Sequence, residues 1–150
     1  MMRQRELNQQ DLEAFLELRM EFLLSYNVIP DENRLRNDTR RYLERYLETE
    51  DLFVLGTEEN GELIAACMVC LYDTSPTVDN PTGRYGELRN VYTKPPYRGR
   101  GIAKALVLES METARKRGAG KMRLHYTEDG LPLYQKLGFL PEENYMEKDL

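Results

Sequence analysis

The 150-residue chain contains no tryptophan, one histidine and only two cysteines. Cysteine and histidine are the principal zinc ligands, so this short supply predicts no metal site. Long apolar runs are missing too, since none approaches the roughly 20 residues needed to span a bilayer. The polar residues 1–6 also lack the apolar core of a secretory signal. These absences predict a soluble, cytoplasmic protein without a membrane partner.

The two cysteines, Cys67 and Cys70, stand in a C-x-x-C spacing that is common in metal and redox sites. They lie in the apolar run 63–72, which predicts a buried strand. Side chains three positions apart on a strand point to opposite faces. The two thiols are therefore expected to pack in the core and not to share a metal or a disulfide.

Positive charge is in deficit, with 21 Lys and Arg against 26 Asp and Glu and a net charge of −5. This balance argues against a nucleic-acid partner. Basic residues gather at positions 34–45 and 98–104. The first group alternates with Tyr and Leu and predicts the solvated face of a helix. The length and the absence of linkers or repeats predict a single domain over residues 1–150.

The apolar pattern predicts a mixed α/β fold. The pair Asn60-Gly61 between two apolar runs predicts a β-hairpin, because both residues tolerate positive φ. Asp38 or Thr39 is the expected cap of a second helix. The expected strands cover residues 3–6, 52–57, 62–72, 85–93 and 121–126, with a last extended segment from 139, and the expected helices cover residues 8–26, 39–47, 101–117 and 131–137.

A glycine-rich turn, Arg98-Gly99-Arg100-Gly101, joins the apolar segment 88–93 to an amphipathic helix. The N–H groups at the start of a helix lack intrahelical partners, and the helix dipole there favours negative charge. Glycine lets a ligand approach the backbone closely, and the arginines add positive charge. The turn therefore predicts a site for a phosphate-containing ligand.

Three common phosphate-binding patterns do not fit this turn. A P-loop needs four residues between its first glycine and Gly-Lys, which this segment lacks. A dinucleotide-binding turn needs a small residue where Lys104 stands. Arginine–glycine segments that bind RNA are repeated, whereas this turn occurs once between a strand and a helix.

The pattern Arg98-x-x-Gly101-x-Ala103 resembles motif A of the GNAT superfamily of acyl-CoA-dependent N-acetyltransferases. Downstream, Tyr134-x-Lys136-x-Gly138-Phe139 is similar to motif B of the same family. The resemblance implies a mostly antiparallel central sheet with splayed central strands and about four flanking helices. It also implies acetyl-CoA as co-substrate, with no metal.

The resemblance assigns the CoA contacts. The pyrophosphate is expected on the N–H groups from Arg98 to Ala103, and the pantetheine arm along residues 91–93. Thr127 stands where family members often carry an asparagine that contacts CoA. The expected CoA-binding residues are Val91, Tyr92, Thr93, Arg98, Gly99, Arg100, Gly101, Ile102, Ala103, Lys104, Thr127 and Lys136.

Acetyl transfer to an amine needs a base, an oxyanion donor and an acid for the departing thiolate. The resemblance places Tyr134 beside the sulfur as the acid, and the backbone N–H of Val91 or Tyr92 at the oxyanion. Glu87, on the central strand, is the expected base. Asn90 and His125 are expected to contact the substrate: Asn90 to position it or a water, and His125 as the less favoured base.

The expected function is transfer of acetyl from acetyl-CoA to a primary amine of a small molecule or peptide, by direct attack in a ternary complex. The alternative is a non-catalytic CoA-binding sensor. Four arginines favour an acidic acceptor, and a homodimer is compatible with the resemblance. These arginines are Arg34, Arg36, Arg40 and Arg41.

Overall fold

The computed structural model describes residues 1–142 and 144–150. The strands are β1 (Met2–Glu6), β2 (Leu52–Glu59), β3 (Glu62–Asp73), β4 (Arg84–Leu88), β5 (Tyr92–Thr93) and β6 (Lys121–Leu124). The helices are α1 (Leu12–Tyr26), α2 (Glu32–Tyr46), α3 (Ile102–Lys116) and α4 (Leu131–Lys136), with 3₁₀ turns η1 (Gln9–Asp11) and η2 (Pro95–Tyr97). The predicted mixed α/β class is confirmed.

One sheet runs in the order β1-β2-β3-β4-β6, and β5 pairs with β3 beyond the end of β4. All pairs are antiparallel except β4 with β6, which are parallel. The Asn60-Gly61 hairpin is confirmed, with φ values of 53° and 82° and Glu59 opposite Glu62. The sheet therefore places β3 and β4 at its centre, where the site is built.

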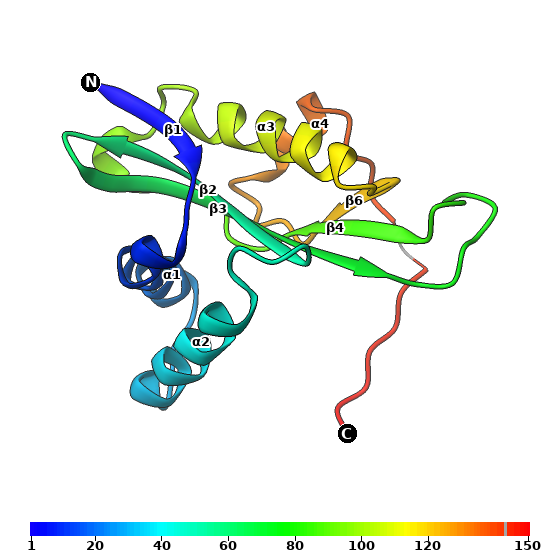
Figure 1. Ribbon diagram of the computed structural model, residues 1–150, viewed down its shortest axis with the longest axis horizontal. Coiled ribbons are helices and arrows are strands. Elements are labelled where there is room, and N and C mark those ends of the chain that lie inside the picture. Colours follow the sequence, from blue (N-terminus) through cyan, green and yellow to red (C-terminus); the bar gives the residue numbers. More distant parts are fainter. Residues whose placement is uncertain (143) are drawn as a thin grey trace.

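Helices cover both faces of the sheet, α1 and α2 on one and α3 and α4 on the other (Figure 1). Each face has its own apolar core, one around Phe15 and Leu43 and one around Leu106 and Val107. Strand β3 supplies residues to both. Cys67 joins the α3 core and Cys70 packs against the α1 core, so the prediction of opposite faces is confirmed.

Helix α2 begins at Glu32, not at the predicted position near Asp38. The Asp31 side chain accepts a hydrogen bond from the Arg34 N–H at 3.0 Å and caps the helix. The first two turns were missed because residues 31–38 are almost entirely polar and carry no apolar stripe. Ion pairs from Arg36 and Arg40 to two α1 glutamates, Glu17 and Glu13, hold these turns against α1.

The predicted last strand is wrong for the described residues from Phe139 on, which form none. The Phe139 N–H turns back to the Tyr134 carbonyl at 3.0 Å, which closes α4 instead of starting a ladder. Beyond it, residues 140–142 and 144–150 are exposed, and the C-terminus lies on the side of the sheet that carries α1 and α2 (Figure 1). Within the described ranges, no helix is long and apolar enough to cross a membrane.

Candidate active site

The predicted strand 85–93 is interrupted, and the interruption opens the sheet. Leu88 pairs with Val69, and the next pair is Tyr92 with Ala66. The chain therefore advances four residues while β3 advances three, which is a β-bulge. The Arg89 N–H still reaches the Met68 carbonyl at 2.9 Å. No carbonyl among the described residues accepts the N–H groups of Asn90 and Val91.

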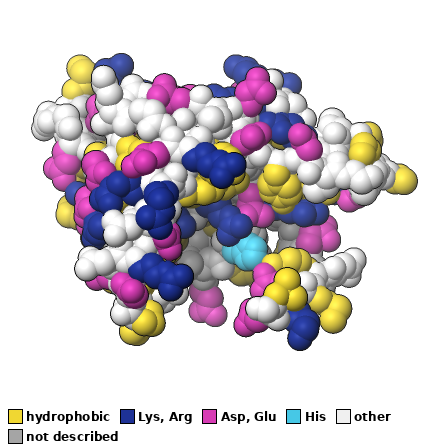
Figure 2. Space-filling view, turned by 60° about the horizontal axis from the view of Figure 1, so that its bottom comes forward, with side chains coloured by type: hydrophobic (Ala, Val, Ile, Leu, Met, Phe, Trp, Pro, Cys, Tyr) yellow, Lys and Arg dark blue, Asp and Glu magenta, His cyan; other side chains and the backbone are white. Residues whose placement is uncertain are grey.

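A cavity of about 590 Å³ lies at this interruption, between the β4–β5 segment and the start of α4. It extends from the end of α1 to the start of α3, and the molecule is visibly hollowed beside its single histidine (Figure 2). Twelve of the predicted site residues line it: Val91, Tyr92, Thr93, Arg98, Gly99, Gly101, Ile102, Ala103, Lys104, His125, Thr127 and Tyr134.

The glycine turn forms one end of the cavity. Gly99 and Gly101 have φ of 79° and 76°, the left-handed region that glycine enters without strain. Helix α3 starts immediately after, so the N–H groups of its first turn have no intrahelical partner. No acceptor in the described part of the chain takes the N–H of Gly99, Arg100 or Gly101 either. The turn can therefore offer a row of N–H donors to an anion.

Arginine side chains brace this turn from outside. The Arg98 Nε donates to the Thr93 carbonyl at 2.9 Å, and its guanidinium lies 5.4 Å from the centre of the Tyr92 ring. The Arg98 N–H is used by the Pro95 carbonyl at 3.3 Å. Arg100 stacks over Tyr97 and does not line the cavity.

Tyr134 closes the opposite wall from α4. Its side chain is buried, edge-on to Phe139, and burial raises the pKa of its phenol to about 12. The hydroxyl has no protein hydrogen-bond partner among the described residues. A phenol that stays protonated at neutral pH and faces a cavity can donate a proton or a hydrogen bond.

Comparison with known proteins bears directly on this site. The family model described as "Acetyltransferase (GNAT) family" matches residues 12–139, which include the bulge, the glycine turn and α4. The chain belongs to the GNAT acetyltransferase family. The prediction made from the two motifs is thereby confirmed.

Solved GNAT structures share the whole fold. A predicted acetyltransferase of Clostridium acetobutylicum, solved with acetyl-CoA, superposes with a TM-score of 0.92 at 30% identity, covering 99% of this chain and 96% of that one. A GCN5-related N-acetyltransferase of Ralstonia eutropha gives 0.89 at 28% identity, covering 100% and 99%.

Curated relatives match over shorter stretches. A glucosamine 6-phosphate N-acetyltransferase of Trypanosoma brucei brucei is 42% identical over 65 residues, which are 43% of this chain and 44% of that protein. An uncharacterized N-acetyltransferase of Escherichia coli, YjgM, is 41% identical over 56 residues, 35% and 34% of the two chains. The chain thus spans less than half the length of these relatives.

The polar groups at the GNAT cleft fit acetyl-CoA. Two buried side-chain atoms in the bulge region have no partner in the described structure, Asn90 Nδ2 and Thr93 Oγ1. Buried polar atoms are normally paired, so Thr93 Oγ1 at the cavity wall and Asn90 Nδ2 behind the bulge indicate a ligand or water that satisfies them. A phosphate fits the N–H groups of the glycine turn, and an amide-bearing arm fits the open edge at Val91.

Four predicted residues do not line the cavity: Glu87, Asn90, Arg100 and Lys136. Lys136 is exposed on α4. Glu87 is mostly buried and forms an ion pair with Arg89, with 2.6 Å between Oε2 and Nε. Asn90 lies fully buried behind the bulge. Within the described residues, no group of three His, Cys, Asp or Glu side chains could hold a metal ion.

The structure adds residues that sequence reasoning missed. Phe22 and Tyr26, from the last turn of α1, line the cavity together with Arg89. Phe22 contacts Tyr92 with ring centres 5.7 Å apart. The apolar stripe of α1 marked Phe22 as core, but no local pattern indicates which end of a helix reaches a cleft. The ion pair between Glu87 and Arg89 could have been predicted, because side chains two positions apart on a strand point to the same face.

Proposed function

We propose that this GNAT protein transfers the acetyl group of acetyl-CoA to a primary amine by direct attack. The observation that carries the proposal is the joining of the bulge, the glycine turn and Tyr134 in one cavity. Acetyl-CoA supplies an activated acyl group as its thioester. The protein's own groups bind acetyl-CoA, polarise its thioester and transfer the protons.

The glycine turn is the proposed phosphate site, and the open β4–β5 edge is the proposed site of the pantetheine arm. The free N–H of Val91 is the proposed donor to the thioester oxygen, because a fixed donor stabilises the negative charge that develops there. Removing one such donor in other enzymes costs about 100-fold or more in kcat. Val91 presents this donor at the bulge, at the middle of the cleft.

Tyr134 is the proposed acid for the departing thiolate. Because burial raises the pKa of its phenol from 10 to about 12, the hydroxyl keeps its proton across the physiological range. Ionisation of Tyr134 would therefore affect the rate only as the pH rises toward 12. Glu87 is the proposed base, acting through water, since it does not line the cleft itself.

The experiment is an acetylation assay that measures CoA release over a panel of amines, which includes glucosamine 6-phosphate because a relative carries that name. We expect turnover with at least one amine, a kcat at least 10-fold lower for Tyr134→Phe, and equal acetyl-CoA affinity for both proteins. An unchanged kcat removes Tyr134 from the mechanism. Tight binding without transfer to any amine contradicts the proposed function and favours a CoA sensor.

A further inference from the structure

An arginine without a carboxylate partner among the described residues lies beside the bulge, on the α1 side of the sheet. Arg19 comes from the middle of α1, and most of its side chain is covered by neighbouring residues. Its single hydrogen bond to protein, among the described residues, runs from Nη1 to Asn90 Oδ1 at 3.3 Å. None of the described acidic side chains forms a salt bridge with it.

Burying the Arg19 guanidinium in this way destabilises the folded protein unless a ligand pairs with it. A guanidinium carries five N–H donors and no acceptor, so one long hydrogen bond leaves most of its donors unused. Burial lowers the pKa of the Arg19 guanidinium, and nearby Arg89 lowers it further, while Cys70 and Tyr42 act the other way. Buried charges in proteins are normally paired, and this one is not.

Asn90 gives a second, independent sign of a ligand. Because arginine only donates, the amide oxygen of Asn90 must face Arg19, and its Nδ2 must point elsewhere. That Nδ2 is fully buried and has no acceptor among the described residues. A donor with no acceptor thus lies next to a cation with no anion.

Arg89 extends the positive charge to the cleft. Glu87 lies opposite Cys70 in the β3–β4 register, so both point to the α1 face, as does Arg89 two residues later. Arg89 pairs with Glu87 through Nε and also lines the cavity. Among the described residues, Glu87 is the one carboxylate that pairs with either Arg19 or Arg89, so two arginines share a single carboxylate on this face.

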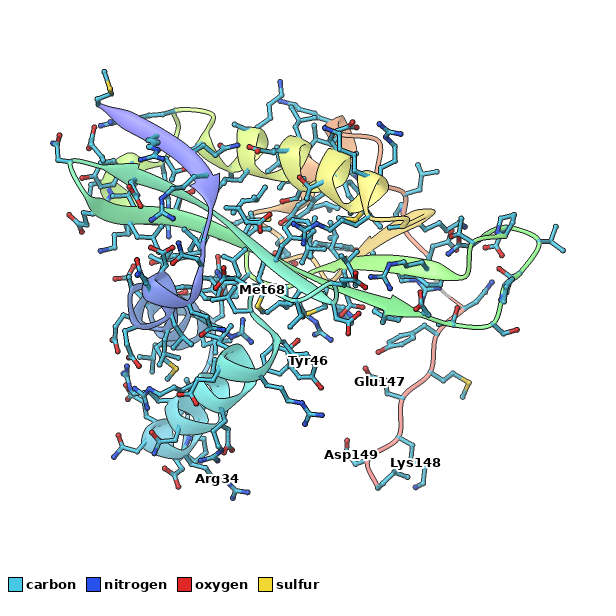
Figure 3. The ribbon with its side chains drawn as sticks, in the orientation of Figure 1. Arg34, Tyr46, Met68, Glu147, Lys148 and Asp149 are labelled. Carbon is cyan, nitrogen blue, oxygen red and sulfur yellow. The ribbon has the colours of Figure 1, made fainter. Side chains whose placement is uncertain are left out.

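We infer that the acceptor amine carries an anionic group, a carboxylate or a phosphate, and that Arg19 and Arg89 bind that group with the Asn90 amide. This inference rests on the proposed acetyl transfer and names the class of its acceptor. None of the four α2 arginines expected to favour an acidic acceptor lines the cavity, and Arg41 pairs with Asp38 within α2. Arg36 and Arg40 are paired with α1 glutamates, and Arg34 lies at the end of α2 far from the sheet (Figure 3).

The test compares Arg19→Met with the wild type on matched acceptors. The phosphate arm uses glucosamine 6-phosphate against glucosamine, and the carboxylate arm uses an amino acid against its carboxamide. We expect the wild type to prefer the anionic member in one arm. Arg19→Met should lower kcat/KM for that member by about 30-fold, the loss of one charge-assisted hydrogen bond of about 2 kcal/mol. Activity on the neutral member should fall by a clearly smaller factor, because that member has no anionic group for Arg19 to bind.

Two controls separate binding from folding. Arg34→Met removes an arginine that is 79% exposed and should leave the charge preference intact. Arg19→Met removes an uncompensated charge but also leaves the buried Asn90 Oδ1 without its donor, so we expect these opposing effects to change Tm by only a few degrees. A fall in Tm with equal losses on both acceptors would show a structural role and overturn the inference.

The outcomes distinguish this inference from the proposed function. Transfer without a charge preference, or a preference that Arg19→Met does not change, overturns the inference and leaves acetyl transfer standing. If acetyl-CoA binds but no amine is acetylated, the proposed acetyl transfer is contradicted. Binding of inorganic phosphate then tests whether Arg19 holds an anion. In CoA-saturated protein, phosphate should raise the Tm of the wild type and not of Arg19→Met; equal shifts overturn the inference.

Discussion

At the residue scale, the ion pair between Glu87 and Arg89 decides how the proposed base works. The carboxylate lies on the α1 face at 2.6 Å from the guanidinium, outside the cavity. A direct proton transfer from the acceptor would need the amine to reach that face. A water between Glu87 and the amine removes this requirement, because it carries the proton over the remaining distance.

We predict that Glu87→Gln lowers kcat/KM by about 100-fold near neutral pH. Alkylammonium groups lose their proton near pH 10, so the free amine becomes abundant without help as the pH rises. The deficit of the variant should therefore shrink steadily between pH 7 and about 10. The measurement is a pH–rate profile of kcat/KM for both proteins.

His125→Gln is the matched control for this profile. His125 lines the cavity, is exposed, and lies edge-on to Tyr145 at 6.1 Å between ring centres. We expect its substitution to leave the profile unchanged in shape. A large deficit for His125→Gln with a normal Glu87→Gln profile would assign the base to the histidine instead.

At the element scale, a substitution in the glycine turn should change ligand affinity more than the stability of the fold. A Cβ at Gly101 would meet no protein atom within 4 Å, so the strain of a side chain at φ 76° is the main cost to the free protein. That strain is about 1–2 kcal/mol. Because Gly101 lines the cavity at the proposed pyrophosphate site, an added Cβ there would crowd the ligand.

We predict that Gly101→Ala weakens acetyl-CoA binding by about 10-fold or more while Tm falls by only a few degrees. Gly61→Ala is the control, because Gly61 has φ 82° and equally open surroundings but lies in the β2–β3 hairpin. It should lose similar stability and no affinity. Equal affinities for the two variants would contradict a ligand site at the turn.

The sequence predicted the elements whose signals are local and left open those that depend on distant partners. The hairpin and the glycine turn are each determined by adjacent residues, Asn60-Gly61 and Gly99 to Gly101. The start of α2 was missed because its first turns are held by α1 glutamates, which no local pattern shows. The splaying of the central strands was expected from the family resemblance, because residues 85–93 were predicted from their own pattern to form one strand.

In the candidate site, too, the residues of one local segment could be predicted and those that meet only through packing could not. The predicted cavity-lining residues near the glycine turn belong to one continuous segment, so a motif could indicate them together. Arg19 and Asn90 are 71 positions apart and meet only through packing of α1 on the sheet. A lone arginine in an apolar stripe gives no sign of its partner. Acceptor recognition was therefore the part of the site that sequence reasoning reached least.

At the scale of the whole molecule, the two faces of the sheet have different tasks. The α3–α4 layer contributes the glycine turn and Tyr134, the proposed groups for the donor, and the α1 layer contributes Arg19, the proposed group for the acceptor (Figure 1). The bulge after β4 opens the sheet between these layers. Donor and acceptor can then meet at the centre of the fold without either helix layer moving aside.

The central claim is that this opening and the glycine turn together bind acetyl-CoA. A calorimetric titration of the wild-type protein with acetyl-CoA tests it most directly. We predict saturable binding of one acetyl-CoA per chain, with a matching rise in stability of about 2.7 kcal/mol at 100 times the Kd. No heat of binding and no rise in Tm at millimolar acetyl-CoA would contradict the account.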